Sequence, residues 1–161
     1  MEERPQVSGA VSTLSQLSAW SLVVFGGLSL LLVCFSWNWA GALIGIALLG
    51  HGIAEARLRG RFLQNGQRET GKGLAWNQMA LSASVLLYLA WQALAIDRAE
   101  LDAMFARDPL RSLLQQMPPE VADMLNRDFP KLLAGAYGIA GLLVLLGCLG
   151  MALMYLKAAR R

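Results

Sequence analysis

Four long apolar runs constrain this chain more than any other feature of its sequence. The first run, 14–36, contains no charged residue, and the others cover 39–54, 74–96 and 132–156. A helix rises 1.5 Å per residue, so about 20 residues cross a hydrocarbon core about 30 Å thick. The run 39–54 is short and reaches the interface only when Glu55 is included. We therefore predict an all-α membrane protein with four transmembrane helices in a bundle.

The composition supports this class of protein. The chain has 161 residues, of which 56% are hydrophobic and only 16% are charged, so it is more apolar than an average soluble domain. Its net charge is +3, but the basic residues flank the apolar runs and form no patch on a polar face. We therefore expect membrane lipid and other membrane protein chains as partners, and no nucleic acid.

The charges between the apolar runs predict the orientation. The loop 55–73 carries five basic and two acidic residues, whereas the segment 97–131 carries seven acidic and five basic residues. Loops rich in Lys and Arg remain on the cytoplasmic side of a membrane. We therefore place the loop 55–73, the tail 1–13 and the basic end of 132–161 in the cytoplasm, and 97–131 outside. Both termini are then cytoplasmic, in what we take to be a prokaryotic cytoplasmic membrane.

Aromatic residues support the same orientation, because Trp and Tyr gather at the two membrane interfaces. Three of them fall near the expected inner boundary, namely Trp20, Trp76 and Tyr155. Four fall near the outer boundary, namely Trp37, Trp39, Trp91 and Tyr137. The aromatic residues at the ends of the spans within 14–96 and 132–156 therefore agree with the orientation predicted from the charges.

The segment 97–131 has the pattern of three short amphipathic helices. Asp97 opens a sequence that resembles a capping box. Asp108 at the N-cap and Pro109 at the first helical position suit the second helix. The third helix should end before Pro130, because proline disfavours a helical conformation in the residue before it.

The second of these helices has the clearest apolar face. Its apolar residues recur at i, i+3, i+4 and i+7, namely Leu110, Leu113, Leu114 and Met117. Such helices can cap the bundle, lie in the outer headgroup layer or dock on a partner. The sequence leaves these three alternatives open.

His51 and Glu55 are the pair of polar residues that most strongly suggests a functional site. At i and i+4 they share a helix face at the inner end of the second span, and an ionisable group at membrane depth is a functional hypothesis. They could relay a proton or supply two metal ligands. The structural alternative pairs Glu55 with Arg59 one turn on and lets His51 hydrogen-bond a neighbouring helix. We favour that alternative and expect no metal, because one His and one carboxylate are too few ligands.

Small residues line two of the spans and predict close helix contacts. On the second span they are Gly41, Gly45 and Gly52. On the fourth span the stripe includes Gly138, Gly141, Cys148 and Ala152. Packing within the bundle is favoured over a dimer seam, since small-residue stripes usually mark bundle contacts.

The third span offers the one stripe that could face a pore. Its residues, which fall within about 60° on a helical wheel, are Asn77, Ser84, Tyr88 and Gln92. The first span has only Ser18, Ser29 and Ser36 on a comparable line. Such side chains form interhelical hydrogen bonds more often than they line a path, so packing is the favoured interpretation.

No pattern in the sequence names a reaction. Cys34 and Cys148 fall at different membrane depths, so no intrachain disulfide is expected, and a single histidine argues against a structural zinc site or haem. We therefore assign no catalytic residues and no cofactor.

Three functional hypotheses remain. The favoured one is a non-enzymatic membrane subunit or scaffold that associates with itself or with a larger complex. The second is a small homo-oligomeric channel or transporter for a small solute or ion that uses the stripe from Asn77 to Gln92. The third is a membrane enzyme built on His51 and Glu55.

Overall fold

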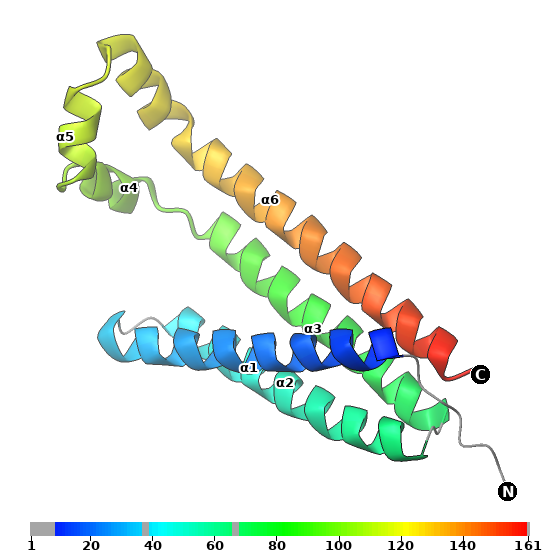
Figure 1. Cartoon of the computed structure of the whole chain (residues 1–161). Helices are drawn as coiled ribbons and strands as arrows, with labels where there is room; N and C mark the ends of the chain where they lie inside the picture. The colour runs from blue at the N-terminus through cyan, green and yellow to red at the C-terminus, as the bar shows by residue number, and fades with distance from the viewer. Residues whose placement is uncertain (1–8, 37–38, 66–67, 161) are drawn as a thin grey trace, which may run out of the picture. The chain divides into compact units, whose positions relative to one another are not determined.

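The fold consists of α-helices. The computed structural model describes residues 9–36, 39–65 and 68–160, and no β-strand occurs in these ranges. Figure 1 shows the six helices, which are α1 (Gly9–Ser36), α2 (Trp39–Asn65), α3 (Arg68–Leu94), α4 (Arg98–Phe105), α5 (Leu110–Gln115) and α6 (Pro119–Ala158). The prediction of an all-α chain is therefore confirmed for the described residues.

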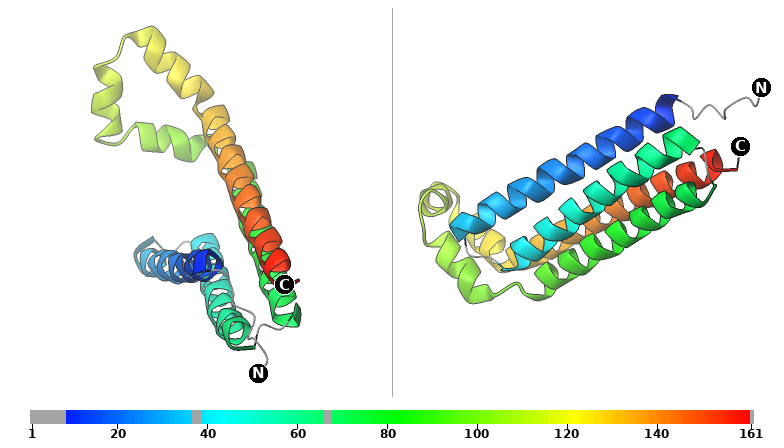
Figure 2. Two further views of the ribbon diagram at one scale, coloured as in Figure 1. Left: turned by 45° about the vertical axis from the view of Figure 1, so that its right-hand side comes forward. Right: turned by 90° about the horizontal axis from the view of Figure 1, so that it is seen from below.

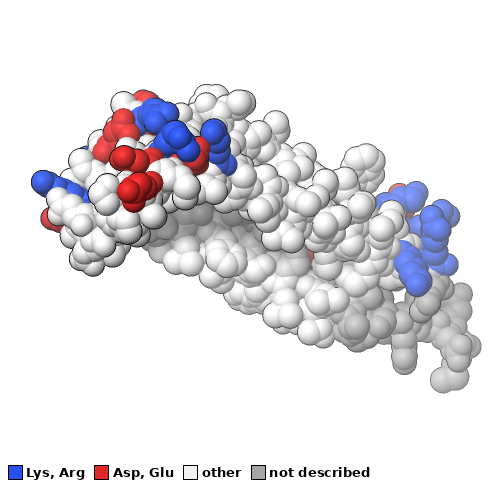
Figure 3. Space-filling view, turned by 90° about the horizontal axis from the view of Figure 1, so that it is seen from above, with Lys and Arg blue, Asp and Glu red and all other residues white. Residues whose placement is uncertain are grey.

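Three of the helices are long and apolar enough to cross a membrane. Their candidate spans are Ser12–Phe35, Trp39–Gln64 and Pro119–Ala158. A fourth span is reached if α3 and α4, which are bent by 77° at a short break, count together as one. Figure 3 shows that broad areas of one face carry neither acidic nor basic side chains. The helices are therefore compatible with membrane insertion, with three or four spans.

The chain forms two compact units, which are described separately. The first comprises Met1–Tyr88 and Leu143–Arg161, and thus holds α1, α2, most of α3 and the C-terminal part of α6. The second comprises Leu89–Leu142, with the last turns of α3, all of α4 and α5, and the first part of α6.

In the first unit α1 and α2 lie side by side, and glycines allow their close approach (Figure 2). A Cβ on Gly26 would lie 2.8 Å from the backbone nitrogen of Leu49, closer than real Cβ contacts come. A Cβ on Gly52 would lie 3.0 Å from the Val23 side chain, and Gly45 is similarly crowded. Two of the predicted contact glycines, Gly45 and Gly52, therefore lie at the contact between α1 and α2.

The hydrophobic core of the first unit joins α2, α3 and α6. It contains Phe62, Leu74, Ala75, Ala152 and Tyr155. Tyr155 is fully buried, so its ring faces neighbouring helices, while its depth near the inner boundary stays a prediction. Helical spacing explains the burial, because Tyr155 continues the small-residue stripe of Cys148 and Ala152 by one turn.

In the second unit α4 packs on the first part of α6. Asp97 caps α4, since its Oδ1 accepts a hydrogen bond from the Ala99 backbone N–H at 2.9 Å. Phe105 is buried and meets Phe129 edge to face, with ring centroids 5.0 Å apart. The predicted cap at Asp97 is therefore confirmed.

The apolar face predicted for α5 is not packed into a core. No residue of α5 is buried, and the side chain of Leu113 is 49% exposed. Leu110 and Leu114 are half-buried, and Met117 lies beyond the end of the helix. Six residues make less than two turns, so the predicted i to i+7 face exceeds the helix that forms.

Two predicted helix boundaries are wrong. The third outer helix and the fourth span form one helix, α6, with Pro130 inside it. Proline removes one backbone donor, but a long apolar helix can continue beyond it when the adjacent turns remain bonded. The N-cap of α5 is Pro109 and not Asp108, and no side chain caps it.

The helical segments also extend into regions predicted as tail and loop. α1 begins at Gly9, inside the predicted tail, and residues 1–8 of that tail lie outside the described residues. α2 continues to Asn65, because the segment after Glu55 is rich in Ala, Arg and Leu, which favour helix. Positions 37–38, in the predicted first turn, and 66–67, in the basic loop, lie outside the description.

Candidate functional site

Glu55 lies at the centre of the four helices of the first unit. It is fully buried on α2, and each of the other helices donates a hydrogen bond to its carboxylate. The Tyr155 hydroxyl of α6 donates to Oε1 at 2.6 Å. Ser18 Oγ of α1 and Gln78 Nε2 of α3 donate to Oε2 at 3.0 Å and 2.9 Å. We call these four residues the Glu55 centre.

Helical spacing explains how α3 and α6 reach this centre. On α3 the residues Leu74, Gln78 and Ser82 are spaced by four and are all buried, so they form one inward face. On α6 the small side chain of Ala152 lies on the same buried side as Tyr155. α3 therefore brings Gln78 and Ser82, and α6 brings Tyr155, into an otherwise apolar contact.

Further hydrogen bonds connect the members of the centre. Gln78 Nε2 also donates to Ser18 Oγ at 3.4 Å, so Ser18 accepts from Gln78 while donating to Glu55. Ser15, buried one turn before Ser18 on α1, hydrogen-bonds the side chain of Tyr155. The polar groups therefore satisfy one another across helices, as buried polar groups generally do.

No basic residue pairs with Glu55 among the residues that the structure describes. Arg59, one turn along α2, instead donates to the backbone oxygen of Ser12 at 3.3 Å, to Ser12 Oγ at 3.1 Å and to Gln16 Oε1 at 3.3 Å. The predicted pairing of Glu55 with Arg59 is therefore wrong. Arg59 holds α1 against α2, and the partners of the carboxylate are neutral groups.

His51 forms a second polar cluster one turn from Glu55. Its Nδ1 lies 2.9 Å from Asn77 Oδ1, and its Nε2 lies 3.3 Å from Ser84 Oγ. Asn77 Nδ2 also donates to the backbone oxygen of His51 at 3.1 Å. The sequence placed His51 and two residues of the polar stripe in separate hypotheses, and the structure joins them.

The hydrogen bonds indicate how the His51 ring is protonated. Because Asn77 donates through Nδ2, its Oδ1 is the acceptor and His51 Nδ1 carries a proton. Ser84 donates its single hydrogen to the Ala80 oxygen, 3.0 Å away, or to His51 Nε2. When Nε2 carries a proton, it can donate to Ser84 Oγ. Both ring nitrogens of His51 therefore have a hydrogen-bond partner on α3.

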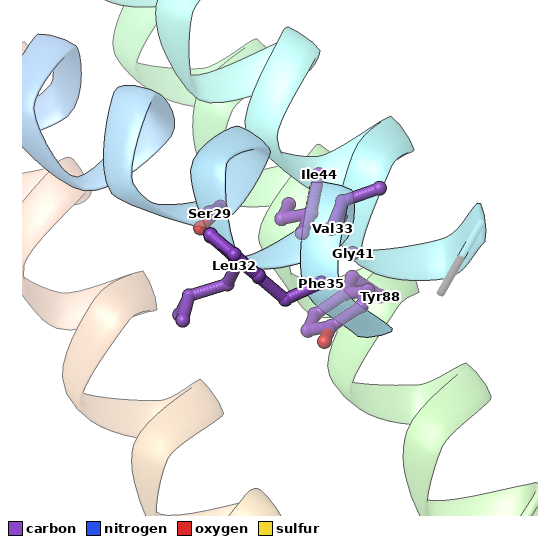
Figure 4. A pocket seen from close by; sticks show the side chains of 7 residues that line it. All are labelled: Ser29, Leu32, Val33, Phe35, Gly41, Ile44 and Tyr88. Atoms are coloured by element: carbon purple, nitrogen blue, oxygen red, sulfur yellow. The ribbon is translucent and has the colours of Figure 1, made fainter. Parts of the chain in front are cut away.

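A pocket of about 450 Å³ lies among α1, α2 and α3 in the first unit (Figure 4). It is lined by Ser29, Leu32, Val33, Phe35, Gly41, Ile44 and Tyr88. The lining is mainly apolar, and its hydroxyl groups come from Ser29 and Tyr88. Tyr88 is one turn from Ser84 on α3, so the pocket adjoins the end of the His51 cluster.

The remaining predicted residues lie apart from these clusters. Gln92, the last residue of the predicted polar stripe, belongs to the second unit. Gly138 and Gly141 lie in the part of α6 that also belongs to that unit, where Gly138 is exposed and Gly141 is buried. Nothing within 4 Å would contact a Cβ on Gly138. The predicted stripe and the small-residue face of α6 are therefore each divided between the two units.

The sequence analysis overlooked the partners that make Glu55 unusual. Gln78 does not belong to the predicted polar stripe, yet it is buried at 2% exposure. Helical spacing places Tyr155 on the same side of its helix as Ala152, but no sequence signal pairs it with Glu55, 100 residues away.

Comparison with known proteins gives no match, since no family model, no curated protein and no solved structure is similar to this chain. The function must therefore be argued from the side chains of the described residues. Within these ranges no group of three or more His, Cys, Asp or Glu residues could hold a metal ion.

Proposed function

We propose that this protein is a small four-span membrane channel or carrier for a monovalent cation, with Glu55 as the cation-binding group. One observation carries the proposal. Glu55 is fully buried among four helices, and its hydrogen-bond partners Tyr155, Ser18 and Gln78 are all neutral. A carboxylate in this position lacks a fixed counter-charge and can therefore receive a mobile one.

The energetics favour function over packing as the reason for this carboxylate. Removing an ionised side chain from water is costly, and replacing buried charged groups by well-packed apolar residues is often neutral or stabilising. The other buried residues at the contact of α2, α3 and α6 include Phe62, Leu74 and Ala152, so apolar packing is already available. The presence of Glu55 needs another explanation, which cation binding supplies.

The arrangement of polar groups supports a path along the helices. Tyr88 lines the pocket, Ser84 follows one turn away, and Ser84 contacts His51, one turn from Glu55. From Glu55 the hydrogen bonds continue to Tyr155 near the C-terminal end of α6. Exchangeable protons and oxygen atoms thus recur from the pocket to the end of the bundle that the sequence predicts to be cytoplasmic.

Cation flux through the purified protein in liposomes tests the proposal. An imposed membrane potential should drive proton or sodium uptake faster than in empty liposomes. Glu55→Gln keeps the size and a hydrogen-bonding amide but removes the charge, so flux should fall at least about tenfold, as expected when one charge-stabilising contact is lost. Glu69→Gln is the matched control, because Glu69 is an exposed glutamate whose partner is Lys72.

Two results would contradict the proposal. One is a wild-type flux equal to that of empty liposomes for both ions. The other is full flux in Glu55→Gln with a circular dichroism spectrum like that of the wild type. Loss of flux in both glutamate variants would point to general damage and would also count against a specific role for Glu55.

A second candidate function keeps the subunit hypothesis of the sequence analysis. It is favoured by apolar side chains that the second unit leaves exposed on α5, in the turn after it and at the start of α6, namely Leu113, Met117, Val121 and Met124. Such residues on a segment expected outside the membrane suit association with lipid headgroups or with another chain. The two functions are compatible, since a small channel can be built by self-association.

A further inference from the structure

Ser82 is the one buried side chain whose polar atom has no hydrogen-bond partner among the described residues. Its exposed fraction is 1%, and it lies one turn from Gln78 on the same inward face of α3. Serine in a helix can satisfy itself by bonding the carbonyl four residues earlier, as Ser84 does with Ala80. Ser82 forms no such bond, and its hydroxyl has no other partner among the described residues.

An unpaired buried hydroxyl costs about 1–3 kcal/mol, so it calls for a specific explanation such as a bound water or ion. Alanine at position 82 would avoid the cost. The neighbouring Gln78 donates to Glu55, which has no basic partner within the described ranges. An unpaired oxygen thus lies one helical turn from the residue that donates to an uncompensated carboxylate.

We propose that the Glu55 centre binds a dehydrated sodium ion and that Ser82 Oγ is one of its ligands. The inference rests on the proposed role of Glu55 in binding a monovalent cation, and it identifies the ion. A proton on Glu55 would neutralise the charge but would leave Ser82 without a partner. A sodium ion accounts for both observations, because hard cations take several oxygen ligands at once.

The chemistry of the centre fits a cation of single charge. It offers one carboxylate, and the described residues provide no cluster of acidic groups for a divalent ion. Ser18, Ser82 and Tyr155 are hydroxyl groups, which can present a lone pair to a cation after rotation about one bond. Gln78 can present its oxygen after a flip of the amide. The donors that hold Glu55 can therefore become oxygen ligands.

Thermal unfolding of the full chain in mild detergent, with sodium chloride exchanged for potassium or choline chloride at constant ionic strength, tests this inference. A ligand that binds the folded state raises the melting temperature. Sodium should raise it for the wild type more than potassium or choline does. Ser82→Ala should weaken the apparent sodium affinity at least about tenfold, as expected for the loss of one ligand to a charged group.

Ser82→Ala should not weaken the protein in sodium-free buffer, because this side chain makes no hydrogen bond that would be lost. Ser21→Ala is the matched control, since Ser21 is an exposed serine of α1 that bonds only its own helix, at Ser18 O. Its response to sodium should equal that of the wild type. Glu55→Gln should abolish the response.

The inference is overturned if sodium stabilises the wild type no more than potassium does, or if Ser82→Ala keeps the full sodium response. Proton flux that depends on Glu55, with no sodium effect, would overturn the sodium site and leave the proposed function standing. A sodium response that requires Ser82, without flux in liposomes, would support the site and refute the transport function.

Discussion

The hydrogen bond between Tyr155 and Glu55 gives the sharpest test of the charge at the centre. Tyr155→Phe removes one hydroxyl and leaves the ring in the core with Phe62 and Leu74, so no cavity forms. The bond is short, at 2.6 Å, which is typical of a charge-assisted hydrogen bond. Such bonds contribute about 1.5–3 kcal/mol, whereas interhelical bonds between membrane helices average about 0.6 kcal/mol.

From these values we expect Tyr155→Phe to lower the free energy of unfolding by about 1.5–2 kcal/mol. Ser15 also loses its partner at Tyr155, but it can bond a carbonyl of its own helix, so its share should be small. The decisive comparison is the same substitution in a Glu55→Gln background. There the acceptor is neutral, and Tyr155→Phe should cost only about 0.6 kcal/mol.

The measurement is a double-mutant cycle in which unfolding by sodium dodecyl sulfate from mild detergent micelles is followed by far-ultraviolet circular dichroism. A coupling energy of about 1 kcal/mol between positions 55 and 155 is expected. Equal costs of Tyr155→Phe in the two backgrounds would refute the reasoning, because the hydroxyl would then not interact with a charge. Tyr137→Phe is the control, since Tyr137 lies in the second unit and bonds no other described residue.

Two further predictions concern packing and association. Gly26→Ala should destabilise the fold by about 1–3 kcal/mol, because its Cβ would lie 2.8 Å from the Leu49 nitrogen, whereas Gly27→Ala should be neutral or slightly stabilising because nothing lies within 4 Å. Chemical denaturation of both variants measures this, and equal stabilities would contradict the packing of α1 on α2. Leu113→Glu should lower the mass of the purified membrane particle if α5 is an association surface, while Gln115→Glu, which adds the same charge on the same helix, should not. Native mass spectrometry decides, and an unchanged mass in Leu113→Glu would exclude this surface.

The sequence by itself determined that the described residues are helical and where most of the long helices lie. A run such as 14–36 is long and apolar enough to cross a membrane, where backbone groups must bond within the segment, so helix is the structure that it favours. Local chemistry also sufficed for the cap at Asp97, whose side chain bonds a backbone N–H two residues away. Local chemistry gave a wrong helix end at Pro130, because the preference of one residue is weaker than the tendency of a long apolar segment to stay helical.

Only the tertiary structure decided what surrounds Glu55. The sequence marked His51 and Glu55 because spacing within one helix is fixed at 3.6 residues per turn. It could not show that Tyr155, Gln78 and Ser18 bind the carboxylate, since those contacts depend on how four helix faces meet. Helix pairing in a membrane is decided by the summed packing of many weak apolar contacts, to which the close approach at Gly26 and Gly52 belongs. No local rule specifies that sum, which is why the predicted pairing of Glu55 with Arg59 was wrong.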